Sequence, residues 1–467
     1  MIPDDGLPTP QRYYAMAVVI LGIAMSVLDG TIVNLALPGI ARDLQASAAH
    51  SIWVVNAYQI ATLALLLPCA ALGDIIGYRR VYLAGLLLFT LASVGCAFAG
   101  SLAMLAATRA IQGLGAAGIM SVNGALVRLI YPKDLLGRGI AINSMVVAAS
   151  SVAGPSVAAS ILSVTTWPWL FAINLPLGAI VLALGRQSLP RSASRNAEAG
   201  GLSCGDVLLN AMMFVLVFLG ADALGVNPGA AANTSSVATG TLLLGCGVAV
   251  GIIYLRRQQH RPLPVFPVDL LRIPVFALSM CTSVTAFTAQ MLAYIALPFL
   301  FLDAYGLPPL EAGLLITAWP LTIVVVAPLV GHMIGRFDDG LLGGIGLGIF
   351  AAGLALLAGL PQQPGHADII WRLIVCGTGF GLFQSPNNHT IVTSAPLHRS
   401  GGASGMLGTA RLTGQTLGAV IVAIIFSVAD AHNGQGPFIA LCLAAAFSAI
   451  ASVFSALRVR GSEKSAD

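Results

Sequence analysis

Charged side chains are scarce in this 467-residue chain, since Asp, Glu, Lys and Arg together make up only 9% of it. Soluble domains average about 25% charged residues, so a chain this poor in charge could not cover a water-facing surface. Hydrophobic residues account for 57% of the sequence. Apolar runs of about 20 residues, each long enough to cross a bilayer as a helix, recur along the whole length. We therefore expect an all-α integral membrane protein.

Three other features are missing. Membrane β-strands alternate apolar and polar residues, whereas the stretch at 81–100, VYLAGLLLFTLASVGCAFAG, does not alternate. The seven cysteines stand singly, without the spacing of metal ligands, and we expect no cofactor. The amino-terminal segment has neither the basic region nor the cleavage site of a signal peptide, so we expect the first apolar run to be kept as a span.

About fourteen spans are expected, which places both termini on the same side of the membrane. Their approximate bounds are 13–37, 51–73, 81–101, 102–130, 139–164, 167–186, 206–225, 235–255, 273–302, 309–335, 340–360, 367–395, 402–428 and 435–457.

The basic residues are divided unequally by these spans. Of the 22 Lys and Arg residues, 18 fall on the side of the termini, Arg42 and Arg372 fall on the other side, and Arg109 and Arg411 lie within spans. Positively charged loops remain in the cytoplasm, so we expect both termini to be cytoplasmic. The net charge of +4 then reflects topology and does not indicate a nucleic-acid partner.

The polar stretches divide the chain into three parts. We expect a six-helix bundle at 1–186, a region at 187–272 with a linker, two extra spans (about 206–255) and a second basic linker, and a six-helix bundle at 273–467. The loop ALGDIIGYRR (71–80) after the second span of the first bundle is echoed by LVGHMIGRFDD (329–339) at the same place in the last. Paired halves of this kind are typical of transporters with a site at the repeat interface.

Several motifs resemble those of the fourteen-span drug:proton antiporters of the major facilitator superfamily, and they occur in that family's order. They are LDGTIVNLALP, LGDIIGYRR, RAIQGLGAA, AGPSVAAS, WPWLFAINLPLG, GTGFGLFQSPNN and GGASGMLGTARLTGQTLG. The resemblance implies a multidrug efflux transporter that exports amphipathic, often cationic compounds and takes in protons. It also implies that the protein is located in the plasma membrane of a bacterium (the inner membrane) and works as a monomer.

The chain departs from the family pattern at a few positions. Ala158 and Ala159 stand where the fifth-span motif usually ends in two glycines, and Pro168 stands where Arg is usual between the two tryptophans. No acid occurs at 312–335, where some members have one, so we expect dicationic compounds to be poorer substrates than monocationic ones.

Asp29 is the acid that the first span carries between Tyr13 and Arg42. We place it about eight residues, roughly 12 Å, from the outer end of that span. Acids inside spans are costly and usually mark ion pathways, so we expect Asp29 to carry the proton and to face a cationic substrate. A polar residue used only for helix packing is the alternative.

Arg109 lies about seven residues, roughly 10 Å, from the outer end of the fourth span, close to the expected depth of Asp29. It is therefore the expected partner in proton coupling, with Gln112 one turn away. A static ion pair between the two spans is the alternative.

Two further motifs suggest conformational roles. Asp74, Gly77, Arg79 and Arg80 are expected to form a cytoplasmic latch whose charge-assisted bonds break during the transport cycle; plain topology anchoring is the alternative. Gly154-Pro155 removes one helix bond, which predicts a bend that the resemblance associates with antiport, or else a kink used for packing.

The predicted substrate cavity combines polar and aromatic side chains from several spans. Arg411 could pair with Asp29 or bind backbone carbonyls, and Trp319 could hold a cation on its ring face. We interpret His389 as a packing residue on an apolar helix rather than a proton relay. The expected lining residues are Asp29, Asn34, Gln112, Trp319, Asn387, Asn388 and Arg411.

Enzymes, sensors and scaffolds fit these features poorly. The spans contain no metal-ligand set, no nucleophile with a base and no paired acids, which argues against an enzyme. A sensor or scaffold would need a soluble domain. A transporter of a metabolite, a lipid or a nutrient stays open as the alternative.

Overall fold

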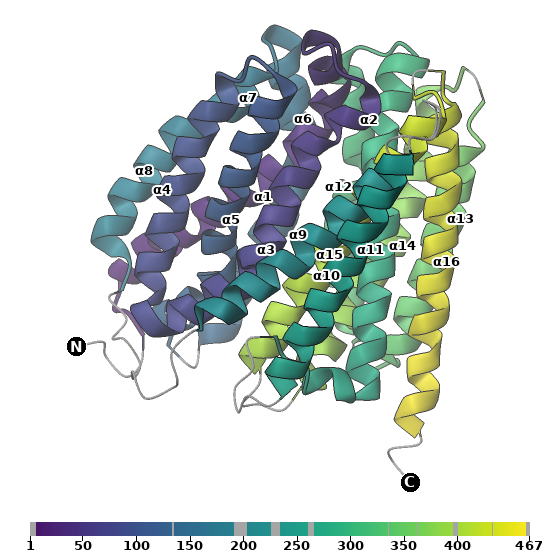
Figure 1. Ribbon diagram of the computed structural model, residues 1–467. Helices are drawn as coiled ribbons and strands as arrows, with labels where there is room; N and C mark the ends of the chain where they lie inside the picture. Colours follow the sequence, from purple (N-terminus) through teal and green to yellow (C-terminus); the bar gives the residue numbers. More distant parts are fainter. Residues whose placement is uncertain are drawn as a thin grey trace. The chain divides into compact units, whose positions relative to one another are not determined.

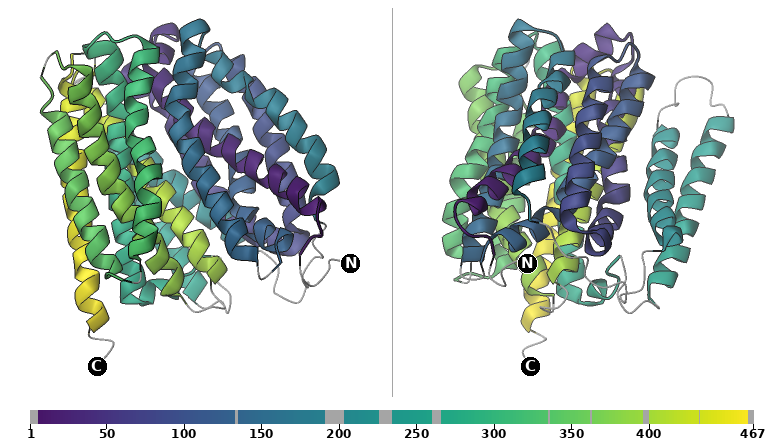
Figure 2. Two further views of the ribbon diagram at one scale, coloured as in Figure 1. Left: turned by 180° about the vertical axis from the view of Figure 1, so that it is seen from behind. Right: turned by 90° about the vertical axis from the view of Figure 1, so that its left-hand side faces the viewer.

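The computed structural model is helical (Figures 1 and 2). It describes residues 6–132, 135–190, 203–225, 234–259, 266–334, 336–361, 363–395, 400–431 and 433–463. Within these ranges there is no β-strand, only an isolated bridge between Ile334 and Phe337. Residues 191–202 and 260–265 of the two predicted linkers lie outside them.

The helices follow one another along the whole chain, with short connections between most of them. In order they are α1 (Gln11–Asp43), α2 (Ala48–Ser51), α3 (Trp53–Ile76), α4 (Tyr78–Ala97), α5 (Leu102–Ile130), α6 (Leu136–Val164), α7 (Pro168–Ala172), α8 (Asn174–Ser188), α9 (Cys204–Gly225), α10 (Thr234–Gln259), α11 (Pro274–Phe299), α12 (Pro309–Met333), α13 (Asp339–Ala358), α14 (His366–Thr393), α15 (Ser400–Val428) and α16 (Gln435–Glu463). A 3₁₀ turn at Leu270–Arg272 precedes α11, and a π-helical turn at Leu300–Ala304 extends it.

Twelve helical spans in the described ranges are long and apolar enough to cross a membrane. The prediction of a helical membrane protein is thus confirmed. Two more helices, α6 and α14, stand where the sequence predicts the fifth and twelfth spans, and they are continuous over 29 and 28 residues. The count of fourteen and the cytoplasmic termini stay predictions.

The first helix is longer than the sequence indicates. α1 passes through Pro38 and ends at Asp43, six residues beyond the predicted end of the span. A proline removes one backbone hydrogen bond but need not end a helix in a membrane, where neighbouring groups can satisfy the freed carbonyl. Asp29 therefore lies 14 residues, about 21 Å, before the end of α1, which is deeper than the expected 12 Å.

The chain forms two compact units. The first unit comprises 1–33 and 53–215, and the second comprises 34–52 and 216–467. This boundary divides both α1 and α9. The three-part division with borders at 186 and 272 stays a prediction.

Glycines bring α3, α4 and α5 of the first unit into backbone contact. A Cβ added at Gly113 would lie 2.3 Å from the Tyr58 carbonyl oxygen, and one at Gly115 would lie 2.5 Å from the Phe89 nitrogen. Because no side chain fits at such distances, these two positions fix how closely α5 approaches its neighbours. The same helix carries Arg109 and Gln112, four residues and one residue before Gly113.

The second unit repeats these contacts with its own helices α12, α13 and α14. A Cβ at Gly377 would lie 2.4 Å from the Trp319 carbonyl oxygen, and one at Gly379 would lie 2.4 Å from the Phe350 nitrogen. Gly377 and Gly379 thus correspond to Gly113 and Gly115. The shared packing supports the internal repeat that the two similar loops indicate.

Candidate functional site

Asp29 of α1 is the centre of a buried polar cluster in the first unit. Its side chain is 1% exposed, and three side chains donate hydrogen bonds to it. Gln112 Nε2 lies 2.9 Å and Asn174 Nδ2 lies 2.8 Å from Asp29 Oδ1, while Arg109 Nη1 donates to Oδ2. The carboxylate is therefore fixed by groups from α5 and α8.

Arg109 of α5 is equally enclosed, with a side chain that is 1% exposed. Its Nε donates to the Val54 carbonyl oxygen at 3.0 Å, and its Nη1 donates to Gln112 Oε1 at 2.6 Å as well as to Asp29. The guanidinium carbon lies 4.3 Å from the Tyr58 ring centre and 5.5 Å from that of Phe171. The cation is thus stabilised by a carboxylate, two carbonyl oxygens and two aromatic faces.

Gln112 connects this ion pair to α4. Besides its bonds to Asp29 and Arg109, its Nε2 donates to Ser93 Oγ at 2.9 Å, and Cys96 Sγ donates to its Oε1 at 3.6 Å. Side chains from α1, α4, α5 and α8 therefore meet in one network, with the Tyr58 ring from α3 and the Phe171 ring from α7 against the cation.

The two charges of this cluster face each other away from water, and the Arg109 cation is one of the three donors to the Asp29 carboxylate. A proton bound at Asp29 would remove the negative charge beside Arg109, and the new O–H would need an acceptor.

The expected contact between Asp29, Arg109 and Gln112 is present in the structure, and their role in proton coupling stays a prediction. Sequence reasoning missed Ser93, Asn174 and the two rings. Asn174 and Phe171 fall within the WPWLFAINLPLG motif, where a single amide in an otherwise apolar stretch was the available signal.

The repeat in the second unit lacks these charges. Arg109 and Gln112 stand four residues and one residue before Gly113, and Leu373 and Cys376 stand at the same distances before Gly377. Both Leu373 and Cys376 are fully buried. The repeated scaffold therefore carries a polar cluster in the first unit and apolar packing at the matching positions of the second.

The other predicted cavity residues have different surroundings. Trp319 is fully buried and packs edge to face against Tyr294 at 4.8 Å and Phe350 at 5.2 Å between ring centres. Asn34 is buried, and its Oδ1 has no hydrogen-bond partner in the described part of the chain. The guanidinium carbon of Arg411, which is half-buried, lies 6.0 Å from the centre of the Phe287 ring.

Asn387 belongs to a second buried network, which sequence reasoning did not find. Its Oδ1 accepts a hydrogen bond from Arg458 Nη1 at 2.8 Å, and its Nδ2 donates to Ser283 Oγ at 2.7 Å. Arg458 Nη1 also donates to Ser279 Oγ at 2.9 Å. This network joins α11, α14 and α16, whereas the neighbouring Asn388 is only half-buried.

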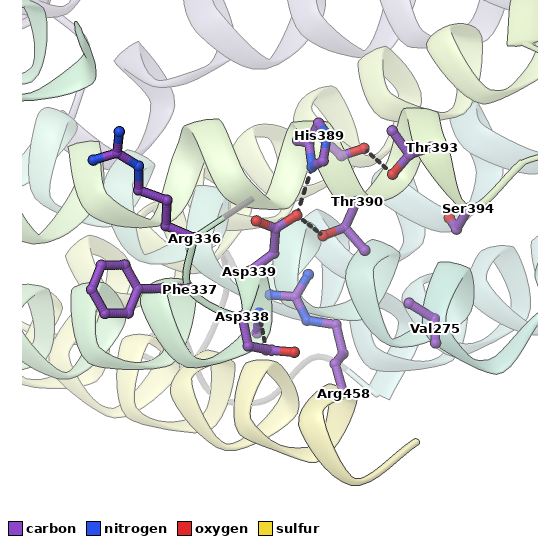
Figure 3. Close-up of a pocket in the computed structure, with 11 residues that line it drawn as sticks. Val275, Arg336, Phe337, Asp338, Asp339, His389, Thr390, Thr393, Ser394 and Arg458 are labelled. Atoms are coloured by element: carbon purple, nitrogen blue, oxygen red, sulfur yellow. Dashed lines mark hydrogen bonds and ion pairs between the residues drawn. The ribbon is translucent and has the colours of Figure 1, made fainter. Parts of the chain in front are cut away.

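A cavity of about 560 Å³ in the second unit lies beside this network (Figure 3). His389 Nδ1 lies 2.7 Å from Asp339 Oδ2, which also accepts from Thr390 Oγ1 at 3.1 Å. Asp338 caps the start of α13 by accepting from two backbone N–H groups. The His389 side chain is 45% exposed and has Asp339 as its partner, and its interpretation as a packing residue rather than a proton relay stays a prediction. It pairs with an acid that is 50 residues away in the chain.

The loop between α3 and α4 contains the predicted latch. Gly77 adopts φ +99°, a conformation that favours glycine and lets α4 begin directly after α3. Asp74 accepts a hydrogen bond from Tyr78, Arg79 donates to the Arg186 carbonyl oxygen at the end of α8, and Arg80 donates to the Ile76 carbonyl oxygen at 3.3 Å. The Arg79 bond ties the loop to the end of α8, and the latch role stays a prediction.

Gly154 and Pro155 lie within the continuous helix α6. A Cβ at Gly154 would lie 2.1 Å from Thr31 Oγ1, so glycine allows α6 to pack against α1 two residues from Asp29. This contact supports the packing interpretation, and a role in antiport stays a prediction.

Comparison with known proteins gives consistent similarities. A family model described as Major Facilitator Superfamily matches residues 19–419 and 278–466. The chain is 52% identical over 458 residues to "Uncharacterized transporter YebQ" of Escherichia coli K12, covering 98% of both chains. It is 31% identical to "Multidrug resistance protein Stp" of Mycobacterium tuberculosis, over 87% of this chain and 74% of the relative.

Two further similarities are more distant. The chain is 28% identical to "Riboflavin transporter RibZ" of Clostridioides difficile, over 91% of this chain and 90% of the relative. Among solved structures, a POT family transporter in complex with 5-aminolevulinic acid aligns over 97% of both chains with a TM-score of 0.71 and 15% sequence identity. At that identity the likeness concerns the fold alone.

Proposed function

Since this chain belongs to the Major Facilitator Superfamily and is a transporter rather than an enzyme, we propose that it exports amphipathic cationic compounds in exchange for protons. It is a multi-pass protein of the bacterial inner membrane and acts on a small molecule. The proposal includes fourteen spans, cytoplasmic termini and action as a monomer.

The buried pair of Asp29 and Arg109 is the observation that carries this proposal. An apolar pair of similar size could pack in the same place without the cost of taking two charges out of water. Packing alone therefore does not account for a buried acid beside a buried base. A carboxylate in a span can take up a proton from one side and release it on the other, or exchange it for a cation. The names of relatives such as "Multidrug resistance protein Stp" are in line with export of toxic compounds.

The cycle that we propose uses the two states of Asp29. When a proton binds, Asp29 becomes neutral and its hold on Arg109, Gln112 and Asn174 weakens. When the proton leaves, the carboxylate is again available to attract a cation. Alternating access follows if the two protonation states favour different conformations, because a ligand shifts an equilibrium only through its different affinity for the two states.

The test is proton-driven transport of a monovalent cationic dye in reconstituted vesicles under an imposed pH gradient. Asp29→Asn keeps the size of the side chain but cannot ionise, so we expect transport to stop. Asp29→Glu keeps the carboxylate, so we expect partial activity with an altered pH optimum. Asp368→Asn is the matched control, because Asp368 is a partly exposed acid bonded to Trp371 and Arg372, outside the site.

Wild-type dye accumulation by Asp29→Asn vesicles would rule out Asp29 as the coupling acid. Dicationic dyes should be moved more slowly than monocationic ones.

Transport of a metabolite is the alternative, since a relative that aligns over 90% of its own length is named as a riboflavin transporter. A growth assay separates the two functions. If expression of this chain protects cells against none of a panel of toxic cationic compounds while vesicles transport riboflavin, the metabolite function is favoured.

A further inference from the structure

One segment of the first unit contacts both members of the buried ion pair. This segment, residues 167–178 (WPWLFAINLPLG), forms what we term the α7–α8 corner. Phe171 places its ring 5.5 Å from the guanidinium carbon of Arg109, and Asn174 places Nδ2 2.8 Å from Asp29 Oδ1. The corner therefore supports the base with an aromatic face and the acid with an amide.

The sequence of the corner explains this double contact. α7 ends at Ala172 and α8 begins at Asn174, with Ile173 between them in a helical conformation. Residues three apart on helical backbone point to the same side, so Phe171 and Asn174 both face the ion pair. Trp167 packs edge-on against Phe171, with 6.3 Å between ring centres.

Gly178 sets the distance at which the corner approaches the site. A Cβ at this position would lie 2.1 Å from Thr90 Oγ1 of α4, so only glycine allows α8 to come this close. Asn174 stands one turn before Gly178 on the same helix. The close approach thus brings the short asparagine side chain within reach of Asp29.

Asn174 and Gln112 both donate to Asp29 Oδ1, but their amide groups differ in how freely they can turn over. Gln112 accepts from Arg109 and donates to Ser93, so turning its amide over would break both of those bonds. Asn174 makes one side-chain hydrogen bond in the described part of the chain, and that bond goes to Asp29. Its amide could turn over without losing another bond.

This freedom matters because Asp29 needs different partners in its two protonation states. An ionised carboxylate only accepts hydrogen bonds, whereas a protonated one has an O–H that needs an acceptor. The amide of asparagine offers a donor at Nδ2 and an acceptor at Oδ1, and a half-turn about its terminal bond exchanges them.

We infer that Asn174 is the positioning residue for proton exchange at Asp29. Its Nδ2 donates to the ionised carboxylate, and after proton uptake its amide turns so that Oδ1 accepts the new O–H. Gln112 keeps its orientation and holds Arg109 in both states. This role rests on the proposed function of Asp29 as the coupling acid.

The test compares Asn174→Leu with Asn174→Asp in purified, full-length protein. Leucine is similar in size and can neither donate nor accept. Asn210→Leu is the matched control, because Asn210 is a fully buried amide of the first unit that donates to the Ala64 carbonyl oxygen and does not contact Asp29. The first readout is the infrared band of the protonated carboxyl group followed over a pH series, assigned to Asp29 by its loss in Asp29→Asn. The second is the pH profile of dye transport.

We expect the Asp29 band of Asn174→Leu to persist to a pH about one unit higher than in the wild type, because the ionised form has lost one donor. The transport profile should move in the same direction, with a maximal rate at least about tenfold lower, the effect of losing more than about 1.4 kcal/mol in the rate-limiting step. Asn174→Asp should move the band further, since two adjacent carboxyl groups share one proton. Asn210→Leu should leave both readouts at their wild-type positions.

An unchanged band and an unchanged profile in Asn174→Leu would overturn the role of Asn174 alone. The failure of the proposed function is a separate result, namely an Asp29→Asn protein that retains the titrating band or the dye transport. If Asn174→Leu does not fold, the nearly isosteric Asn174→Asp decides, and a wild-type band position in that variant would also overturn the inference.

Discussion

Asp29 and Arg109 lie 80 residues apart in the chain, yet they form a hydrogen-bonded ion pair in which each side chain is only 1% exposed. Two opposite charges out of contact with water stabilise each other, and neither can be removed without leaving the other uncompensated. The pair is therefore a structural element of the first unit as well as the proposed site of proton exchange.

The first prediction concerns the stability of this pair. Arg109→Gln should lower the free energy of unfolding by about 3–5 kcal/mol, because the Asp29 carboxylate loses its counter-charge. Thermal unfolding in detergent measures this change. The double variant Arg109→Gln with Asp29→Asn removes both charges and should recover much of the stability while staying inactive in transport. No recovery in the double variant would mean that Arg109 acts through its other contacts.

The second prediction concerns the approach of α8 to α4. Gly178→Ala should destabilise the protein and lower dye transport, because the new Cβ would lie 2.1 Å from Thr90 Oγ1. Adding Thr90→Ala removes that oxygen and should restore part of both quantities. Recovery should be incomplete, since the Thr90 Cβ would still lie 3.0 Å away. Thr90→Ala alone is the control. If Gly178→Ala and the double variant had equal defects in stability and transport, the proposed clash with Thr90 would be contradicted.

The third prediction compares how much two neighbouring hydrogen bonds in the second unit contribute to stability. Asn387→Leu should cost about 1–3 kcal/mol of unfolding free energy, because the buried Arg458 guanidinium loses an acceptor. Asp339→Asn should cost less than about 1 kcal/mol, because its partner His389 is 45% exposed and solvent screens the pair. Chemical unfolding of the two variants side by side tests the order. A larger loss in Asp339→Asn would show that the pair is more strongly coupled than its exposure indicates.

The fourth prediction concerns the α3–α4 loop. Asp74→Asn should slow transport without weakening substrate binding if the loop acts as a conformational latch. Binding in detergent and transport in vesicles give the two quantities separately. Tyr78→Phe removes the hydrogen bond that Tyr78 donates to Asp74 but leaves the charge, and it shows whether that bond or the acid itself is needed. Wild-type turnover in Asp74→Asn would leave the loop as a topology anchor.

Much of the fold was predictable from composition and spacing. The scarcity of charge indicated a helical membrane protein, and similar depths in two spans suggested the contact between Asp29 and Arg109. Asp29 and Arg109 are in contact even though α1 ends later than expected, at Asp43 rather than near 37. Continuity through Pro38 depends on how neighbouring helices satisfy the freed carbonyl, which the local sequence does not specify.

The remaining partners of Asp29 could not be derived in the same way. Asn174 reaches the carboxylate because Gly178 permits a close approach and because α7 and α8 meet at Ile173. Both are features of three-dimensional packing and of rotation about a helix axis. The pairing of His389 with Asp339 likewise depends on where α13 begins, a boundary that hydrophobicity alone does not resolve.

The repeat of Gly113 and Gly115 as Gly377 and Gly379 has a consequence for energetics. Because Leu373 and Cys376 occupy the places of Arg109 and Gln112, the matching positions of the second unit offer no second carboxylate–guanidinium pair for a proton. If Asp29 is the coupling acid and carries one proton in each cycle, exchange of that proton for one monovalent cation moves no net charge. Such an exchange is electroneutral, so it would be driven by the difference in pH across the membrane and would be insensitive to the membrane potential.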